Sequence, residues 1–297
     1  MATKIKELVT RTFMGDRSGH DGERPPMVEI DEEADVLGCQ ERFERAATHV
    51  KPLKILKVDL PGDSATRRIP VLVNDDVRIE LATTGAAAET SYAPAGGWYE
   101  THIQVEGTST SRTVAGEYAM TPSNLLVAPP GASHHSTNDG PMSRLIVSTR
   151  RPLKVAAGYP LRESAATGDQ GAGEPCLYLR PGVAAESAEE GVSGGKHFEL
   201  VVNDDLMIET TFRADDQRIY HRGYAQDEVH FQLTGRRATR TAQGEFVLET
   251  GDMLLIPPGV THRNIGGMPT IRIVLYTRNP LRVADEYQAR LGSAWGN

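Results

Sequence analysis

Two short motifs rich in metal-binding side chains occur twice in this 297-residue sequence. One motif reads Glu-x-His-x-Gln, and the other reads Pro-Pro-Gly-x-x-His. Their chemically active residues are Glu100, His102, Gln104 and His134 in the first copy, and Glu228, His230, Gln232 and His262 in the second. Imidazole and carboxylate groups are common protein ligands of divalent transition metals. The repeated motifs therefore predict a metal site.

The Glu-x-His-x-Gln motif has the residue pattern of a β-strand. Alternate side chains of a strand share a face, so Glu228, His230 and Gln232 form one polar row while Val229 and Phe231 point away. A buried carboxylate without a partner is costly, and a bound metal ion removes that cost. The alternative is that these rows face solvent on an amphipathic strand.

The Pro-Pro-Gly-x-x-His motif holds its histidine on a stiff turn. Gly131 and Gly259 permit backbone conformations that other residues resist, and the prolines stiffen the approach to the turn. Two imidazoles and one carboxylate leave open positions on an octahedral ion, as in the facial triad of non-haem Fe(II) oxygenases. We therefore expect Fe(II), although Mn, Ni, Co, Cu or Zn could take the same ligands.

The two copies differ in their ligand sets. The second copy adds His221 before Glu228, where the first copy has Tyr92 or Ala93. Either the second copy alone holds a functional ion, or each copy holds one through its Glu-His-His trio. We favour the second copy. Its expected ligands are His221, Glu228, His262 and, as fourth ligand or close neighbour, His230; the possible second site consists of Glu100, His102 and His134.

The motifs belong to a longer internal repeat. VNDDVRIE recurs as VNDDLMIE, and STRRPLKVA recurs as YTRNPLRVA, at nearly constant separation. Each copy consists of short runs of β-branched and apolar residues, separated by Gly, Pro, Asn and Asp and without intervening helices. Such strands need a closed or double-sheet arrangement that covers their edges. We therefore predict an all-β protein of two tandem jelly-roll barrels.

The remaining segments suggest a domain plan. Residues 1–50 are expected to form a partly helical N-terminal arm, with ATKIKELVTRTF and EEADVLGCQERFERAATHV as the helical pieces. Residues 51–157 form the first predicted domain, 158–173 a linker, and 174–297 the second domain with a C-terminal helix. Within the second domain, residues 184–196 have the composition of a flexible insertion.

Composition narrows the classes of function. A net charge of −8 with scattered Lys and Arg argues against a nucleic-acid partner. No apolar run approaches the roughly 18 residues that cross a membrane, and the N-terminus lacks a secretory pattern, so we expect a cytoplasmic protein. Cys39 and Cys176 are far apart and predict no disulfide. No phosphate loop, dinucleotide fingerprint or nucleophile elbow is present.

These motifs resemble the two signature motifs of the cupin superfamily. His221, Glu228 and Gly235 match the first, although Gly223 stands where the usual second histidine would be. The second signature is matched by Gly251, Pro257, Gly259, His262 and Asn264. The resemblance covers both halves from about residue 52 onward, and it implies a bicupin with two double-stranded β-helix barrels.

A finer resemblance concerns the activity. HRGYAQDEVHFQLTG is similar to a segment of homogentisate dioxygenases, and EVHFQLTG to a strand of 3-hydroxyanthranilate dioxygenases. It implies an Fe(II) dioxygenase that acts with O₂ on a phenolic or enediol small molecule. His230 and Gln232 would then assist catalysis, with Gln232 orienting O₂ or a substrate oxygen, and Arg222 or Arg263 would meet a substrate carboxylate.

Two other functions are compatible with the same residues. The first is a non-oxidative metal cupin, namely an isomerase, decarboxylase or lyase in which the ion polarises a carbonyl. The second is a metal-free bicupin that binds a small ligand. We expect a small-molecule substrate in either case, no membrane partner, and a homo-oligomer, with a dimer as the simplest form.

Overall fold

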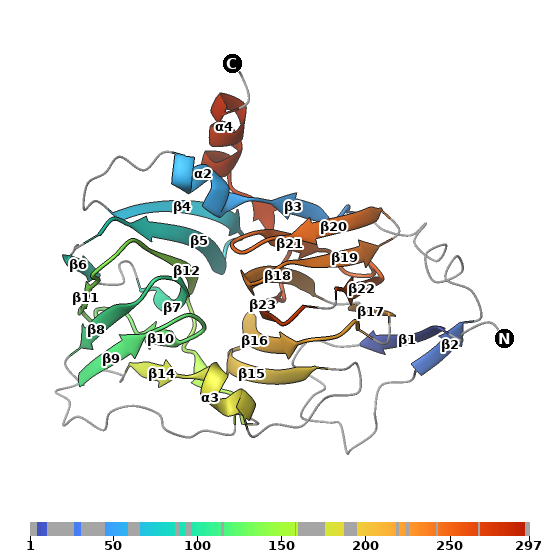
Figure 1. Ribbon diagram of the computed structural model, residues 1–297, viewed down its shortest axis with the longest axis horizontal. Helices are drawn as coiled ribbons and strands as arrows, with labels where there is room; N and C mark the ends of the chain where they lie inside the picture. Colours follow the sequence, from blue (N-terminus) through green and yellow to red (C-terminus); the bar gives the residue numbers. More distant parts are fainter. Residues whose placement is uncertain are drawn as a thin grey trace. The chain divides into compact units, whose positions relative to one another are not determined.

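A computed structural model describes most of the two repeats. The described residues are 5–10, 27–30, 45–58, 66–86, 89–92, 97–113, 116–157, 159, 176–186, 195–217, 220–223, 226–241, 243–266 and 268–294. They are mostly in β-strands, as Figure 1 shows, so the predicted all-β class is confirmed. None of the helices among these residues is long and apolar enough to cross a membrane.

The chain divides into two compact units that interleave along the sequence. The first, here called the N-terminal barrel, comprises Lys51–Ala188, Phe198–Asp205 and Leu281–Asn297. The second, here called the C-terminal barrel, comprises Met1–Val50, Glu189–His197 and Leu206–Pro280. Both compact units are discontinuous in the chain. The domain boundaries expected from the sequence stay a prediction.

The N-terminal barrel contains two antiparallel sheets. The larger has seven strands in the order β14-β10-β7-β12-β5-β4-β24, and the smaller has four in the order β6-β11-β8-β9. The bounds are β4 Thr66–Val73, β5 Val77–Thr84, β6 Glu89–Tyr92, β7 Tyr99–Glu106, β8 Ser109–Thr113, β9 Gly116–Met120, β10 Leu125–Ala128, β11 His134–Thr137, β12 Met142–Thr149, β14 Leu177–Leu179 and β24 Arg282–Val283. Its helices are α2 Pro52–Val58, α3 Pro181–Glu186 and α4 Asp285–Ala294.

The C-terminal barrel repeats this plan. One sheet has the order β2-β1-β17-β22-β19-β20, and the strands β16, β23, β18, β21 and β3 follow one another in the other sheet. The bounds are β1 Ile5–Thr10, β2 Met27–Ile30, β3 Thr48–Val50, β16 Leu206–Arg213, β17 Tyr220–Gly223, β18 Asp227–Thr234, β19 Arg237–Thr241, β20 Gly244–Leu248, β21 Met253–Ile256, β22 His262–Ile265 and β23 Thr270–Thr277. Strand β15 (Lys196–Val202) crosses the division between the units, and its Val202 and Val201 pair with β13 (Lys154–Val155).

Local sequence explains the hairpins. At the first Asn-Asp-Asp segment, the side-chain oxygen of Asn74 accepts hydrogen bonds from the backbone N–H groups of Asp76 and Val77 (2.9 and 2.7 Å). Asn203 binds the N–H of Asp205 in the same way (2.9 Å). Asparagine stabilises turns through such bonds. Both Asn-Asp-Asp segments are therefore turns stabilised by their own asparagine.

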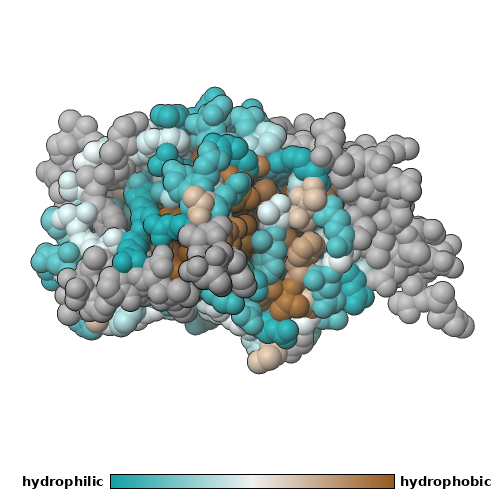
Figure 2. All heavy atoms as spheres, turned by 90° about the horizontal axis from the view of Figure 1, so that it is seen from above, coloured by the Kyte–Doolittle hydropathy of each residue, from teal (hydrophilic) through white to brown (hydrophobic). Residues whose placement is uncertain are grey.

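Burial separates the core from the surface. The interior is built mainly from Leu, Ile and Val of the strands, and the polar Glu-x-His-x-Gln rows are also buried. The alternative in which those rows face solvent is therefore wrong. Hydrophilic residues cover much of the face drawn in Figure 2. Among the described residues, the exposed large hydrophobic side chains are Val183 and Met268.

Three expectations for the non-repeated segments have different outcomes. ATKIKELVTRTF was expected to be helical, but its Ile5–Thr10 segment is strand β1, which pairs in parallel with β17. Pairing with a distant strand overrides the local helical pattern. The start of the expected flexible insertion belongs to α3, and the remainder up to residue 194 lies outside the described residues. The C-terminal helix is confirmed as α4, which packs on α2 and β4.

The second expected helical piece, EEADVLGCQERFERAATHV, is largely outside the described residues. Its last described part includes Thr48, where β3 begins and pairs with β21. The expected linker also lies outside the described residues, apart from the buried Tyr159.

Candidate metal centre

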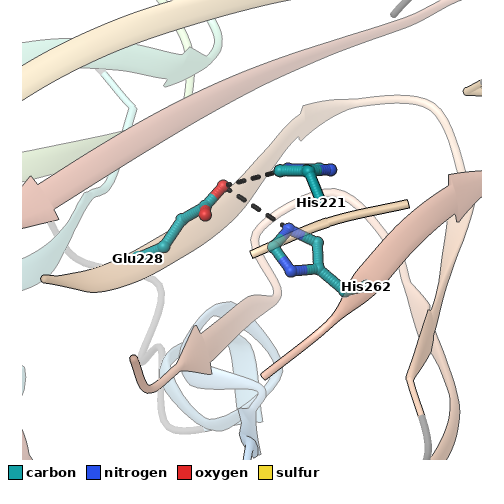
Figure 3. A group of neighbouring side chains, drawn as sticks. All are labelled: His221, Glu228 and His262. Atoms are coloured by element: carbon teal, nitrogen blue, oxygen red, sulfur yellow. Dashed lines mark ion pairs between the residues drawn. The ribbon is translucent and has the colours of Figure 1, made fainter. Parts of the chain in front are cut away.

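Three strands of the C-terminal barrel bring together His221, Glu228 and His262. His221 lies on β17 directly opposite His262 on the neighbouring strand β22, because the two residues are Cα partners in that ladder. Glu228 comes from β18 in the other sheet of the barrel. Figure 3 shows the carboxylate pointing toward the two imidazole rings.

The distances suit a shared ion. The Oε1 atom of Glu228 lies 3.9 Å from Nε2 of His221 and 3.6 Å from Nε2 of His262. The two imidazole rings are 4.0 Å apart between centroids. One ligand atom from each residue lies within 4.8 Å of the others. Among the described residues, no other group of three or more metal-binding side chains is this compact.

His262 presents an unused lone pair to this space. Its Nδ1 donates a hydrogen bond to the carbonyl oxygen of Val260 (3.1 Å), which lies in the Pro-Pro-Gly turn. In the neutral ring, this bond leaves the lone pair on Nε2. Nε2 is buried and has no hydrogen-bond partner. A buried polar atom without a partner is costly, and a metal ion in front of it would remove that cost.

His221 is held by an amide on its other side. Gln217 donates from Nε2 to Nδ1 of His221 (2.9 Å). The amide oxygen of Gln217 accepts hydrogen bonds from the backbone N and from Nδ2 of Asn264 (3.0 and 2.9 Å). Asn264 therefore determines which end of the Gln217 amide faces His221.

The protonation states match those of a metal site. Burial, together with the neighbouring His262 imidazole, lowers the pKa of His221 to about 4. Burial alone would raise the pKa of Glu228, but its interactions with His262, His230 and His221 hold that pKa well below the ordinary value. At neutral pH, His221 is therefore uncharged and Glu228 is ionised. These are the forms that bind metals.

His230 lies beside the cluster with both ring nitrogens engaged. Its Nδ1 accepts a hydrogen bond from Arg272 (2.9 Å), so Nε2 carries the proton and donates to Oε1 of Glu228 (2.6 Å). Burial and the charge of Arg272 lower the pKa of His230 to about 3. The ring is neutral and fixed between a guanidinium and a carboxylate.

Gln232 lies behind this pair. Its Oε1 accepts hydrogen bonds from Nε and from one terminal nitrogen of Arg272 (3.3 and 3.2 Å), and its Nε2 donates to the carbonyl oxygen of Thr234 (2.7 Å). The amide is therefore engaged at both ends. Gln232 is not among the residues that line the adjacent cavity.

A cavity of about 170 Å³ opens beside the cluster within the C-terminal barrel. Its lining residues are His197, Glu209, Thr211, Arg213, Gln217, His221, Glu228, His230, Arg237, Asn264, Thr270, Arg272, Val274 and Tyr276. The three arginines and Gln217 were not identified from the sequence. The signal that could have found Arg213 and Arg272 is a charged residue within an otherwise apolar strand, where it shares a face with polar neighbours.

Of the two arginines expected to meet a substrate carboxylate, Arg263 is not among the residues that line this cavity. The guanidinium of Arg263 instead lies 5.0 Å from the ring centroid of Tyr220. The side chain of Arg222 lies outside the described part of the chain.

Known proteins share this architecture at low sequence identity. No family model matches the chain. No curated protein matches its sequence either. A cupin 2 conserved barrel domain protein from Leptotrichia buccalis is similar in structure, with a TM-score of 0.55 and 10% identity, over 80% of this chain and 99% of that one. Salicylate 1,2-dioxygenase from Pseudaminobacter salicylatoxidans has a TM-score of 0.56 and 12% identity, over 86% and 87%. A putative glyoxylate-induced protein from Pseudomonas aeruginosa has a TM-score of 0.56 and 11% identity, over 82% and 93%.

The chain has a bicupin fold. At these identities, the similarity shows the fold alone. The chemistry of the site has to be inferred from the residues of this chain.

The N-terminal barrel holds its motif residues in a different arrangement. Nε2 of His102 lies 3.2 Å from Oε2 of Glu100, and the rings of His102 and His134 are 4.7 Å apart between centroids. Tyr92 is the Cα partner of His134, so Tyr92 holds the position that His221 has in the other barrel. The described residues of this barrel form no group of three metal-binding side chains comparable to the one around Glu228.

A guanidinium accompanies the carboxylate in this barrel. Arg68 on β4 donates to Oε1 of Glu100 (2.8 Å) and also forms an ion pair with Glu80. Burial alone would raise the pKa of Glu100, but its interactions with His102 and Arg68 lower that pKa to about 2. Counting from the shared Asn-Asp-Asp turn, the C-terminal barrel has His197 where the N-terminal barrel has Arg68. The charge of Glu100 is thus compensated by the protein itself.

A buried arginine organises the interior of both barrels. Arg144 donates to Oε1 of Gln104 (3.1 Å) and to the hydroxyl groups of Ser136 and Ser109 (2.9 and 2.6 Å). Arg272 holds the corresponding Gln232 in the C-terminal barrel. The glutamine at the end of each Glu-x-His-x-Gln row is therefore bound to an arginine of the neighbouring strand.

Proposed function

We propose that this bicupin holds one divalent metal ion in its C-terminal barrel, through His221, Glu228 and His262, and acts as an Fe(II)-dependent dioxygenase. The observation that carries the proposal is the buried Nε2 of His262, which faces an ionised carboxylate and has no hydrogen-bond partner. Two imidazoles and one carboxylate are the ligands of the facial triad in non-haem Fe(II) oxygenases. A salicylate 1,2-dioxygenase among proteins of the same fold supports the reaction class.

When bound, such an ion supplies Lewis acidity and, as Fe(II), redox chemistry with O₂. The surrounding residues keep its ligands in place. His230 donates to Glu228, and Arg272 fixes the tautomer that makes this possible. We therefore assign His230 to the support of Glu228 rather than to ligation, because Arg272 can only donate to Nδ1 and so keeps the proton on Nε2. Gln232 acts through Arg272 as a positioning residue.

Ligation by Nε2 of His221 requires one local change. In the present arrangement, the Gln217 amide donates to Nδ1, which places the proton of the neutral ring on Nε2. Metal binding requires the lone pair there, with Nδ1–H donating outward. The Gln217 amide must therefore turn so that its oxygen faces His221, and its two hydrogen bonds from Asn264 oppose this turn.

The cavity limits the size of the substrate. Its volume of about 170 Å³ is below the roughly 300–1,000 Å³ of pockets that hold drug-sized ligands. Glu228, His221 and His230 line one part of it, so a compact substrate can reach the metal ligands. We propose a small phenolic or enediol compound. The finer resemblance to homogentisate and 3-hydroxyanthranilate dioxygenases stays a prediction, as do the cytoplasmic location and the dimer.

We further propose that the N-terminal barrel holds no ion. Arg68 already compensates Glu100, and Tyr92 takes the strand position of His221. A divalent ion near Glu100 would have to compete with this guanidinium. The expected stoichiometry is one ion per chain.

The experiment is anaerobic loading with Fe(II), followed by oxygen-electrode measurements with a panel of small hydroxylated aromatic compounds. We expect O₂ uptake equal to substrate loss, absent in Glu228→Gln and retained in His134→Gln. Turnover that is unchanged without O₂ would replace the dioxygenase with the non-oxidative isomerase, decarboxylase or lyase. Absence of any metal after loading would support the metal-free ligand-binding alternative.

A further inference from the structure

We infer that the cavity of the C-terminal barrel binds a small carboxylate anion, with Arg237 and Arg213 as the groups that receive the carboxylate. The inference deepens the proposed function, because it names the substrate class of the same site. It rests on the charge and hydrogen bonding of the cavity wall, which are independent of the metal.

The wall of the cavity carries an excess of positive charge. Three arginines, Arg213, Arg237 and Arg272, line it together with only two carboxylates, those of Glu209 and Glu228. All five side chains are buried. A divalent ion at Glu228 would increase the excess. A cavity wall with an excess of positive charge attracts anions, so the cavity favours an anionic occupant.

Arg272 is used by the protein itself. Its guanidinium donates to His230, Gln232 and Asn264. Burial and the nearby Arg237 lower the pKa of Arg272 to about 9, although Glu228 opposes the shift. Arg272 therefore stays charged at neutral pH, but its donors are directed at fixed side chains.

Arg237 is less completely used. It is 3% exposed, and its Nε atom is buried without a hydrogen-bond partner. One terminal nitrogen donates to the carbonyl oxygen of Asp215, and the other makes a long bond to the hydroxyl of Thr270 (3.4 Å). Burial lowers the pKa of Arg237 to about 10, against the charges of Asp216 and Asp215. At neutral pH it is a buried cation with an unused donor.

The backbone of Arg213 lies close to Arg237, because both contact the hydroxyl of Thr270. The hydroxyl of Thr270, which accepts from Arg237, donates to the backbone carbonyl of Arg213 (3.4 Å). The Arg213 guanidinium is hydrogen-bonded to Nε2 of His197 (3.1 Å). The side chains of Arg213 and Arg237 line the same cavity. A guanidinium presents a planar fork of donors, which matches the planar geometry of a carboxylate.

The other barrel lacks this feature. By alignment of the repeats, Ser109 stands at the position of Arg237, and Thr84 at that of Arg213. The arginine that both barrels share is the structural one, Arg144 in the first and Arg272 in the second. The additional arginines thus occur only in the barrel that has the metal-binding cluster, as expected if they contact its substrate.

The test is a calorimetric titration of the full-length chain with benzoate and with its neutral isostere benzamide. The variants are Arg237→Gln, Arg237→Lys and, as a matched control, Arg236→Gln, because Arg236 is the exposed neighbour. Each preparation is checked for melting temperature and metal content. Inorganic phosphate is titrated in parallel to separate a carboxylate site from a general oxyanion site.

We expect benzoate to bind the native chain more tightly than benzamide. Its affinity should fall about tenfold or more in Arg237→Gln, because charge-assisted hydrogen bonds are lost. It should fall less in Arg237→Lys, which retains the charge but not the fork, and stay unchanged in Arg236→Gln. Benzamide should bind both the native chain and Arg237→Gln equally.

Equal binding of benzoate and benzamide to the native chain would overturn the inference. So would full benzoate affinity in a folded Arg237→Gln variant, or phosphate binding that is tighter than benzoate binding. If Arg237→Gln does not fold, the comparison of Arg237→Lys with Arg236→Gln decides. Loss of metal with retained benzoate binding would contradict the proposed function alone, and the reverse result would contradict this inference alone.

Discussion

Replacement of Arg68 by alanine should destabilise the N-terminal barrel, because it removes the cation that compensates two buried carboxylates. The Arg68 guanidinium is paired with both Glu80 and Glu100. Their side chains are 5% and 10% exposed, whereas that of Arg68 is 30% exposed. Without Arg68, Glu100 keeps its contact with His102, whereas Glu80 loses its ion pair with Arg68.

The size of the effect follows from the pKa of Glu100. Its fall from 4.5 to about 2 corresponds to roughly 3 kcal/mol, at about 1.4 kcal/mol per unit. His102 contributes to this fall, and the partial exposure of Arg68 screens its share. Adding the lost pairing of Glu80, we expect Arg68→Ala to lower the free energy of unfolding by about 2 kcal/mol at pH 7.

The pH dependence has a definite sign. Because the pKa of Glu100 is lower in the folded state, its contribution to stability is complete above about pH 4.5 and is lost as the pH falls toward 2. The difference between the native chain and Arg68→Ala should therefore be largest at pH 7 and should shrink below pH 4.5.

Urea denaturation at several pH values measures this difference, with Arg67→Ala as the control on the same strand. The control should lie within about 0.5 kcal/mol of the native chain, as surface substitutions usually do. If Arg68→Ala is as stable as Arg67→Ala at pH 7, or if its loss is independent of pH, then Arg68 does not compensate the carboxylates.

Other predictions concern the two barrels separately. Gln217→Glu should tighten metal binding about tenfold or more, because either oxygen of a carboxylate can accept a hydrogen bond from Nδ1 of His221 without rotation of the side chain. Competition with a chelator measures the affinity. Unchanged or weaker binding would show that His221 is not a ligand. Arg272→Lys should weaken metal binding by about 10- to 100-fold through the loss of support for His230, and an unchanged affinity would show that this support is unimportant. Burial, together with the electrostatic influence of His102 and Arg144, lowers the pKa of His134 to about 2. As the pH falls below about 6.5, His134 therefore takes up a proton in the unfolded chain but not in the folded chain, and the free energy of unfolding decreases. His134→Gln should remove up to about 1.4 kcal/mol per pH unit from that slope between pH 6.5 and 4.5, and an unaltered slope in urea denaturation would assign the titration to another group.

The fold and the three clustered residues were accessible from the sequence for a physical reason. Period-two rows and stiff Pro-Pro-Gly turns are local patterns, and their repetition indicates the same barrel twice. The register that places His221 opposite His262 is a property of the folded barrel, and the sequence pattern alone does not give it. The Glu-x-His-x-Gln motif was less informative about the role of each residue. Alternation along a strand predicts that Glu228, His230 and Gln232 share a face, but it does not predict what each side chain contacts.

The remaining features depend on contacts between distant segments. Ile5–Thr10 is a strand because β17 offers it a partner, which no local pattern reveals. The roles of Arg237 and Arg272 arise from contacts with residues on other segments of the chain, which the sequence alone does not give. Arg68 is similar, since its effect on Glu100 depends on a contact between β4 and β7.

Metal identity and stoichiometry per chain test the central claim most directly. Elemental analysis after anaerobic reconstitution should find one iron per chain, and none in His262→Ala. Arg68→Ala and His134→Gln, both in the other barrel, should retain one. Two ions per chain, no ion in the native protein, or full occupancy in His262→Ala would contradict the account.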